Sequence, residues 1–213
     1  MAKKMKNNTV EFNNTGLSCQ AWNNNVGQFV TPEAVELTWA NVNQHDEENL
    51  VYQAAFRIPV DGWGGEFKDT VTAWENEMRS DLGEDEVEIA SIFLTQNGSV
   101  RVSDCGDFYE IRAAGKTNED EYTTQSGRTV APFQKNRPRV YDVHGNRDDD
   151  LQIWAGDRAK VSASLGFYRS SNNYGTKLYI KGVQQIEAGS GPTNTNPFGD
   201  EGGDDEGNTD LPF

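Results

Sequence analysis

Two alternating segments near the end of the chain constrain the fold more than any other feature. From Lys160 to Tyr168, and again from Lys177 to Lys181, apolar residues occupy every second position, with a polar turn between the segments. A period of two places alternate side chains on opposite sides of a β-strand, and two such strands joined by a short turn pair antiparallel. The sequence therefore predicts a hairpin with one apolar face. Its other face carries cations, small residues and tyrosines, and no acidic residue.

Similar segments indicate that strands also build the rest of the body. Tyr52, Ala54, Phe56 and Ile58, for example, alternate with their neighbours in the pattern of a half-buried strand. The expected strands are Glu33–Val42, Asn49–Pro59, Ile89–Leu94, Val100–Ser103 and Phe108–Ala114, with short extended pieces at Thr129–Phe133 and Pro138–Val143.

One segment has a helical period instead. Phe67, Val71, Trp74, Met78 and Leu82 are spaced by three or four residues and form one apolar stripe. This pattern predicts an amphipathic helix, and a place in the stripe favours core packing over base stacking for its tryptophan. These patterns indicate a mainly β fold class with one amphipathic helix and long polar loops.

The net charge of −15 argues at first against nucleic acid as a partner, because DNA affinity depends largely on Lys and Arg. Residues 1–127 contain nine basic and 22 acidic residues, whereas residues 128–181 contain ten basic and five acidic ones. Residues 182–213 contain seven acidic residues and no basic one. The cations are thus gathered in one segment, as a local basic groove with an acidic competitor would require.

The last stretch, Asp200 to Phe213, is acidic and glycine-rich and ends in Leu-Pro-Phe. So few apolar residues cannot offset the entropy of ordering, so we expect a disordered tail. Its carboxylates can occupy a basic groove, and its end can dock on a partner protein; a solubilising tail is the alternative. The residues expected to bind a partner are Asp204, Asp205, Glu206, Asp210, Leu211, Pro212 and Phe213.

We expect three regions: a flexible N-terminal arm over residues 1–28, a binding domain over residues 29–188 and the disordered tail over residues 189–213. The chain is long enough for one domain with a real core. Cys19 and Cys105 lack metal-ligand spacing, so neither a metal site nor a cofactor is expected. With no apolar run of membrane length and no leader, we expect an intracellular protein.

A resemblance rests on the order of several short stretches. They are RPRV at 137–140, DVHGN at 142–146, WAGDRAKVSASL at 154–165, GFY at 166–168 and residues 175–185, with VTP at 30–32 and residues 52–59 upstream. With the acidic tail ending in Pro-Phe, they resemble the single-stranded DNA-binding proteins of bacteriophages. The resemblance implies an OB-fold-like antiparallel barrel and sequence-tolerant binding of single-stranded DNA. It also implies a role in phage replication and recombination in the cytoplasm of the infected bacterial host, where the tail recruits phage or host replication proteins.

A protein that holds single strands without reading sequence needs cations for phosphates and flat rings for bases. The predicted hairpin and the segment before it supply both. Trp154 could equally join Leu151 and Ile153 in a small core cluster, and Arg57, Arg101 and Arg112 could extend the groove. The candidate DNA-binding residues are Lys135, Arg137, Arg139, Tyr141, Trp154, Lys160, Tyr168, Lys177, Tyr179 and Lys181.

Two other classes compete with a binding protein. An enzyme is disfavoured because the sequence has no nucleophile elbow, no phosphate-cradling loop and no metal-ligand cluster. A β-rich phage structural protein would explain the strands and glycines. It would not explain the acidic tail with its aromatic end, or the gathered cations.

Overall fold

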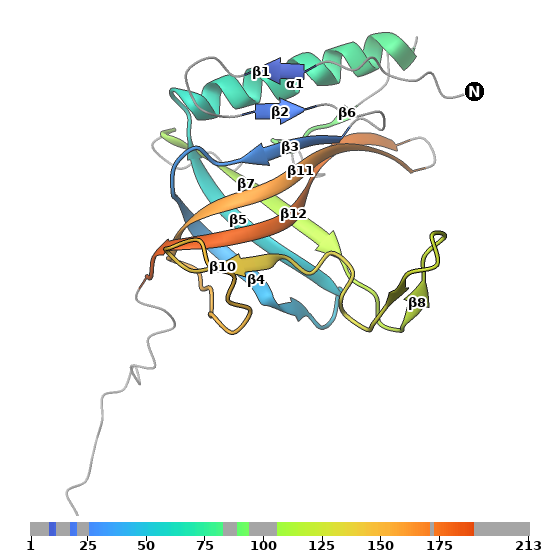
Figure 1. Ribbon diagram of the computed structural model, residues 1–213. Helices are drawn as coiled ribbons and strands as arrows, with labels where there is room; N and C mark the ends of the chain where they lie inside the picture. The colour runs from blue at the N-terminus through green and yellow to red at the C-terminus, as the bar shows by residue number, and fades with distance from the viewer. Residues whose placement is uncertain are drawn as a thin grey trace, which may run out of the picture.

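Five strands close into a barrel in the computed structural model, which describes residues 9–11, 18–20, 26–82, 89–93, 106–170 and 173–189 (Figure 1). Each of them pairs with two others, so the barrel is closed. In the order of pairing, the barrel strands are β4 (Val35–Asp46), β5 (Val51–Pro59), β7 (Phe108–Lys116), β12 (Asn173–Glu187) and β11 (Arg158–Ser170), which returns to β4.

The pairing order identifies the barrel type. Counted along the chain, the barrel strands pair in the order first, second, third, fifth, fourth, and the fourth closes on the first. This is the five-stranded Greek-key barrel of an OB-fold. The predicted OB-fold-like barrel is therefore confirmed. One pairing departs from the antiparallel expectation, since β12 meets β7 in parallel at Leu178 and Ala113.

Short strands extend the barrel sheet. β3 (Val26–Val30) lies antiparallel to β11, while β10 (Arg139–Tyr141) and β6 (Ile89–Ala90) lie parallel to β12. The paired body thus begins at Val26, inside the segment expected to be a flexible arm. Two further pairs stand apart from this sheet, β1 (Thr9–Glu11) with β2 (Ser18–Gln20) and β8 (Tyr122–Thr123) with β9 (Thr129–Val130).

The predicted helix is α1 (Trp63–Leu82), which covers one end of the barrel (Figure 1). Phe67 and Val71 of its apolar stripe are buried; the side chains of the other three stripe residues lie outside the described part. The Phe67 ring stacks on Phe29 of β3 with centroids 4.4 Å apart and meets Phe93 edge-on at 5.7 Å. Rings from distant parts of the chain therefore fix the helix on the barrel.

A long connection between β7 and β10 closes the opposite end of the barrel. The Tyr52 hydroxyl donates a 2.9 Å hydrogen bond to the Phe133 carbonyl, and His45 stacks on the Phe133 ring at 4.5 Å. The β8–β9 hairpin of this connection projects away from the barrel (Figure 1). The loop predicted from Lys116 to Gly127 therefore contains the first strand and the turn of a small hairpin, and the second strand, β9, lies in the predicted extended piece Thr129–Phe133.

Most predicted strands match observed ones to within a few residues. The 33–42, 49–59, 108–114 and 138–143 segments correspond to β4, β5, β7 and β10. Val100–Ser103 and the end of Ile89–Leu94 lie outside the described residues. In the described part, no helix combines the length and apolar character needed to cross a membrane.

The contact between helix and barrel predicts a large loss of stability for Phe67→Ala. Removing a fully buried Phe ring lowers the free energy of unfolding by about 3–5 kcal/mol. Thr72→Ala on the exposed side of the same helix should change it by about 0.5 kcal/mol or less. Urea denaturation of both variants measures the difference. Equal stabilities would contradict the placement of the helix.

Candidate nucleic-acid interface

The outward side of the β11–β12 hairpin carries the residues that the alternation predicted. Leu178 and Ile180 are buried in the core, so Lys177 and Tyr179 lie on the opposite side of β12. Tyr179 pairs with Ser164 of β11, and a Cβ added to Gly166 would lie 3.1 Å from its ring. The missing side chain at position 166 therefore gives the tyrosine ring room to lie against the strand.

A β-bulge places Lys181 outside the regular pairing. Ser162 pairs with Gly182 and Ala163 with Ile180, which leaves Lys181 as the extra residue, with an exposed side chain. A bulge bends the strand and increases its twist. Beyond it, β12 no longer pairs with β7 but with β10, so the bulge marks the point where β12 changes neighbours.

Gly182 allows β10 to approach β12 closely. A Cβ at this position would lie 3.0 Å from the Arg139 carbonyl oxygen and 3.4 Å from the Tyr141 ring. Val140 between them is buried, so Arg139 and Tyr141 lie on the outward side. We call this outward side of three strands the hairpin face; it comprises Arg139, Tyr141, Lys160, Lys177, Tyr179 and Lys181.

Neighbouring groups lower the pKa of one lysine on the hairpin face. Lys177 is half-buried, with its ammonium 5.4 Å from the centre of the Tyr179 ring. Burial lowers the pKa of Lys177, and the nearby Arg112 guanidinium lowers that pKa further. Arg112 is exposed on β7. It therefore extends the cationic surface onto the next barrel strand, as the sequence suggested.

Three predicted residues lie apart from the hairpin face. Lys135 belongs to the β7–β10 connection, where its ammonium lies 5.8 Å from the centre of the Tyr122 ring. Burial raises the pKa of Tyr52, and the nearby Arg137 guanidinium opposes part of that rise. Arg137 also lies near Asp149, whose pKa is lowered chiefly by Arg147 and to a smaller extent by Arg137. Trp154 lies beside β4 and is 43% exposed. For Tyr168, the structure describes the backbone, which pairs with Gly175 near the end of the hairpin.

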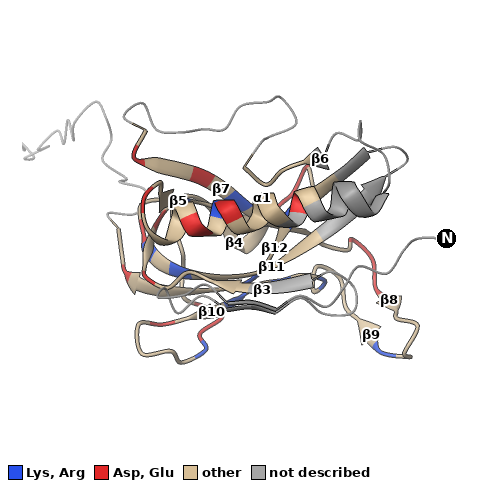
Figure 2. Cartoon of the chain, turned by 90° about the horizontal axis from the view of Figure 1, so that it is seen from above, with Lys and Arg blue, Asp and Glu red and all other residues tan. Residues whose placement is uncertain are grey.

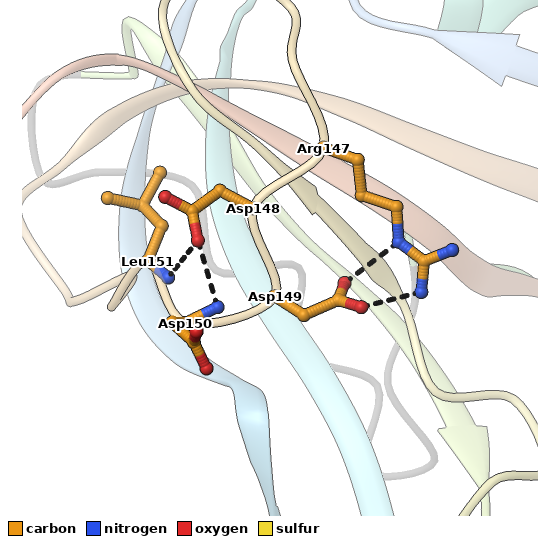
Figure 3. Close-up of polar contacts among 5 residues, drawn as sticks. All are labelled: Arg147, Asp148, Asp149, Asp150 and Leu151. Carbon is orange, nitrogen blue, oxygen red and sulfur yellow. Dashed lines mark hydrogen bonds and ion pairs between the residues drawn. The ribbon is translucent and has the colours of Figure 1, made fainter.

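The acidic turn after β10 forms its own hydrogen bonds (Figure 3). Arg147 donates two hydrogen bonds to Asp149, of 3.0 and 2.6 Å, and Asp148 accepts from the backbone amides of Asp150 and Leu151. The Asp149 pKa is lowered chiefly by Arg147. Among the described residues, no three His, Cys, Asp or Glu side chains gather in a group that could hold a metal ion.

Arg57 and Arg101 were also suggested by the sequence as extensions of the groove. Arg57 donates to both carboxylate oxygens of Glu36, at 3.3 and 3.4 Å, and so is already partnered. These two residues line a pocket of about 480 Å³ that also includes Phe108 and Arg158. Arg101 and the tail residues from Asp204 to Phe213 lie outside the described residues. Figure 2 shows that α1, by contrast with the hairpin face, carries both signs of charge.

Trp39 is an exposed aromatic residue that the sequence did not single out. It lies on β4 with 53% of its surface exposed and pairs with Ala55 of β5, which in turn pairs with Arg112 of β7. A register shift between Leu37 and Trp39 changes which side of β4 the tryptophan occupies. Alternation along the sequence therefore does not predict the side of β4 on which Trp39 lies. The sequence feature that could have identified it is a tryptophan within an otherwise polar strand.

The barrel defines an OB-fold protein, and its outer face at β10, β11 and β12 is basic and bears tyrosines. No protein-family model and no curated protein sequence matches the chain. Solved structures do match. The single-stranded DNA-binding protein gp2.5 of bacteriophage T7 is similar with a TM-score of 0.57 and 16% identity, over 76% of this chain and 87% of its own.

A second phage protein has the same fold. The single-stranded DNA-binding protein of bacteriophage Enc34, as a C-terminal truncation, matches with a TM-score of 0.51 and 12% identity over 81% of this chain and 95% of its own. The Enc34 protein in complex with single-stranded DNA matches with a TM-score of 0.51 and 10% identity over 81% and 96%. At these identities the likeness establishes the fold.

The lowered pKa of Lys177 can be measured directly. As pH rises, Lys177 should lose its proton below the ordinary value of 10.5, and Arg112→Gln should move its pKa partly back upward. Between these pKa values Lys177 holds more proton in the unfolded chain than in the folded one, so the contribution of Lys177 to stability should rise with pH in that window. NMR titration of the lysine side chains tests this. A Lys177 pKa at or above 10.5 would contradict the half-buried position.

Proposed function

We propose that the protein binds single-stranded DNA without reading its sequence, through the hairpin face. The observation that carries this proposal is the composition of that face. It combines four cations with two tyrosines, and no carboxylate is present among its outward residues on β10, on β11 from Lys160 to Gly166 or on β12 from Lys177 to Gln184. Phosphates and bases require these two kinds of side chain.

The small residues of the hairpin face suit a flexible polymer. Gly166 and Gly182 let the rings of Tyr179 and Tyr141 lie flat against the strands, and Ser162 and Ser164 on β11 are small. Every base has a flat ring, so stacking on tyrosine tolerates any sequence. The solved complex of the Enc34 protein with single-stranded DNA supports the same ligand for this fold.

We also propose that the acidic tail competes with DNA for the hairpin face. The region from residue 182 onward has seven acidic residues and no basic one, and the hairpin face is cationic. When DNA displaces it, the tail becomes free to recruit a replication or recombination protein through its Leu-Pro-Phe end. The setting is DNA replication or recombination of a phage, in the cytoplasm of the infected bacterium, and the role requires no catalytic residue.

Substitutions on the hairpin face should weaken DNA binding in two distinguishable ways. Tyr179→Ala removes a stacking ring and should cost about 1–3 kcal/mol in oligo-dT affinity. Lys181→Ala removes one phosphate contact and should reduce the slope of log affinity against log salt by about 0.7. Fluorescence titration at several salt concentrations measures both.

Lys68→Ala provides the matched control for these substitutions. Lys68 lies on α1 with its ammonium 4.8 Å from the centre of the Tyr109 ring, away from the hairpin face. Its loss should leave affinity and salt slope unchanged. If Lys68→Ala weakens binding as much as Lys181→Ala, the hairpin face is not the binding surface.

Removing the tail should strengthen DNA binding. A chain that ends at Gly199 lacks all six carboxylates of the last stretch and should bind oligo-dT more tightly, with a gain that shrinks as salt rises. A full-length chain whose tail carboxylates are changed to amides should show the same gain, whereas deletion of Phe213 alone should not. Unchanged affinity of the shortened chain would rule out the competition.

A further inference from the structure

A pocket of about 480 Å³ lies where β4 and β7 begin and β5 ends. Its volume is in the range of pockets that enclose a ligand or a docked side chain. Ala34, Val35, Pro59 and Phe108 give it apolar walls, and the Phe108 side chain is 40% exposed. An apolar occupant that covers these walls would remove apolar surface from water, which favours binding.

The charged side chains of the pocket already have partners. Glu36 pairs with Arg57, and Arg158 donates a hydrogen bond to the Ala34 carbonyl at 3.3 Å. Glu33 accepts a 2.7 Å hydrogen bond from the indole of the tryptophan that begins α1. The two glutamates and two arginines that line the pocket leave it without net charge. These walls therefore suit a neutral, apolar occupant.

The described part of the chain ends beside this pocket. Gly189 is the last described residue, and its amide donates a 2.8 Å hydrogen bond to the Asp157 carboxylate. A Cβ at Gly189 would lie 2.5 Å from the Gly156 carbonyl, so the two backbones are in direct contact. Gly156 and Arg158, on either side of Asp157, both line the pocket. The segment after Gly189 therefore starts at the rim of the pocket.

The segment that starts there carries an apolar pair outside the acidic stretch of residues 200–213. Residues 190–199 contain no charged side chain and include Pro197 and Phe198. Phe198 comes nine residues after Gly189, a span of at most about 30 Å. So short a tether gives an effective concentration on the order of millimolar, which is enough to populate even a weak apolar contact. The acidic end of the chain suits the pocket less, because two glutamates line it.

The pocket and the hairpin face adjoin along β11. Arg158 lines the pocket, and Lys160 of the hairpin face follows two residues later on the same side of the strand, with buried Ala159 between them. The acidic residues of the tail begin at Asp200, two residues after Phe198. A Phe198 ring in the pocket would therefore bring the first carboxylates of the tail next to the cations of the hairpin face.

We propose that Pro197 and Phe198 dock in this pocket of the same chain and thereby hold the acidic stretch beside the hairpin face. The docking itself does not depend on DNA binding. Its effect on DNA binding rests on the proposed function, which it deepens by naming the contact that positions the tail. Phe198 is the anchor in this arrangement, and the carboxylates are the competitor.

Photo-cross-linking of the full-length chain tests the docking. Phe198→p-benzoylphenylalanine places a photoreactive ring in the pocket, so irradiation should link it to peptides of the same chain that contain Pro59 or Phe108. The same replacement at Phe213 is the matched control and should give several-fold fewer links to these peptides. Equal yields from the two positions, or links that join two different chains, would overturn docking within one chain.

Methyl NMR tests the same contact without a photoreactive group. The Ala34 and Val35 methyl resonances should shift in the full-length Phe198→Ala variant, because the ring current of the docked phenylalanine is lost. Phe213→Ala should leave both resonances in place. Resonances that respond to neither substitution would exclude the docking.

Oligo-dT titration tests what the docking does. Phe198→Ala should raise the affinity about 2- to 5-fold, because the acidic stretch loses its anchor and keeps its charge. Phe213→Ala should leave the affinity unchanged. If the pocket cross-links form but Phe198→Ala binds no more tightly, the docking does not position the competitor.

Failure of the docking and failure of the proposed function give different results. Oligo-dT binding by a wild-type chain without pocket cross-links would overturn the docking and leave the proposed function standing. Pocket cross-links in a chain that does not bind oligo-dT would overturn the proposed function and leave the docking standing.

Discussion

The fold depends on the register of the β11–β12 hairpin. Val161, Leu165 and Leu178 enter the core only in this register, and a slip of one residue would exchange them with the outward cations and tyrosines. The same two strands also hold β3, β10 and the closing contact with β7. The pairing that fills the core thus also creates the hairpin face.

Local periodicity was sufficient to predict the hairpin and the helix, because each depends on spacing within one segment, whereas the OB-fold-like barrel was predicted from the resemblance to phage proteins. Pairing between distant segments was not predictable in this way: the parallel contact of β12 with β10 depends on the bulge at Lys181 and on Gly182. The register shift before Trp39 hid an outward tryptophan. The sequence also left open whether Trp154 joins Leu151 and Ile153 in a core cluster or is available for stacking. In the structure Ile153 is buried and Trp154 is exposed.

Local charge, and not net charge, decides what such a chain can bind. Two cations outside the hairpin face are partnered, Arg57 by Glu36 and Arg147 by Asp149, and these ion pairs bring little stability at an exposed surface. On the hairpin face the cations lie beside tyrosines and small residues. There, burial and the nearby Arg112 lower the pKa of Lys177. A surface that keeps like charges together is poised for an anionic partner, at some expense in stability.

Amide hydrogen exchange with and without oligo-dT tests the central claim, that the hairpin face binds single strands. Binding should slow exchange in residues 139–141, 158–166 and 177–184, since a ligand that covers these strands reduces their local opening. Exchange in α1, at the end of the barrel, should not change. Protection confined to α1, or oligo-dT binding without protection of β10, β11 and β12, would contradict the account.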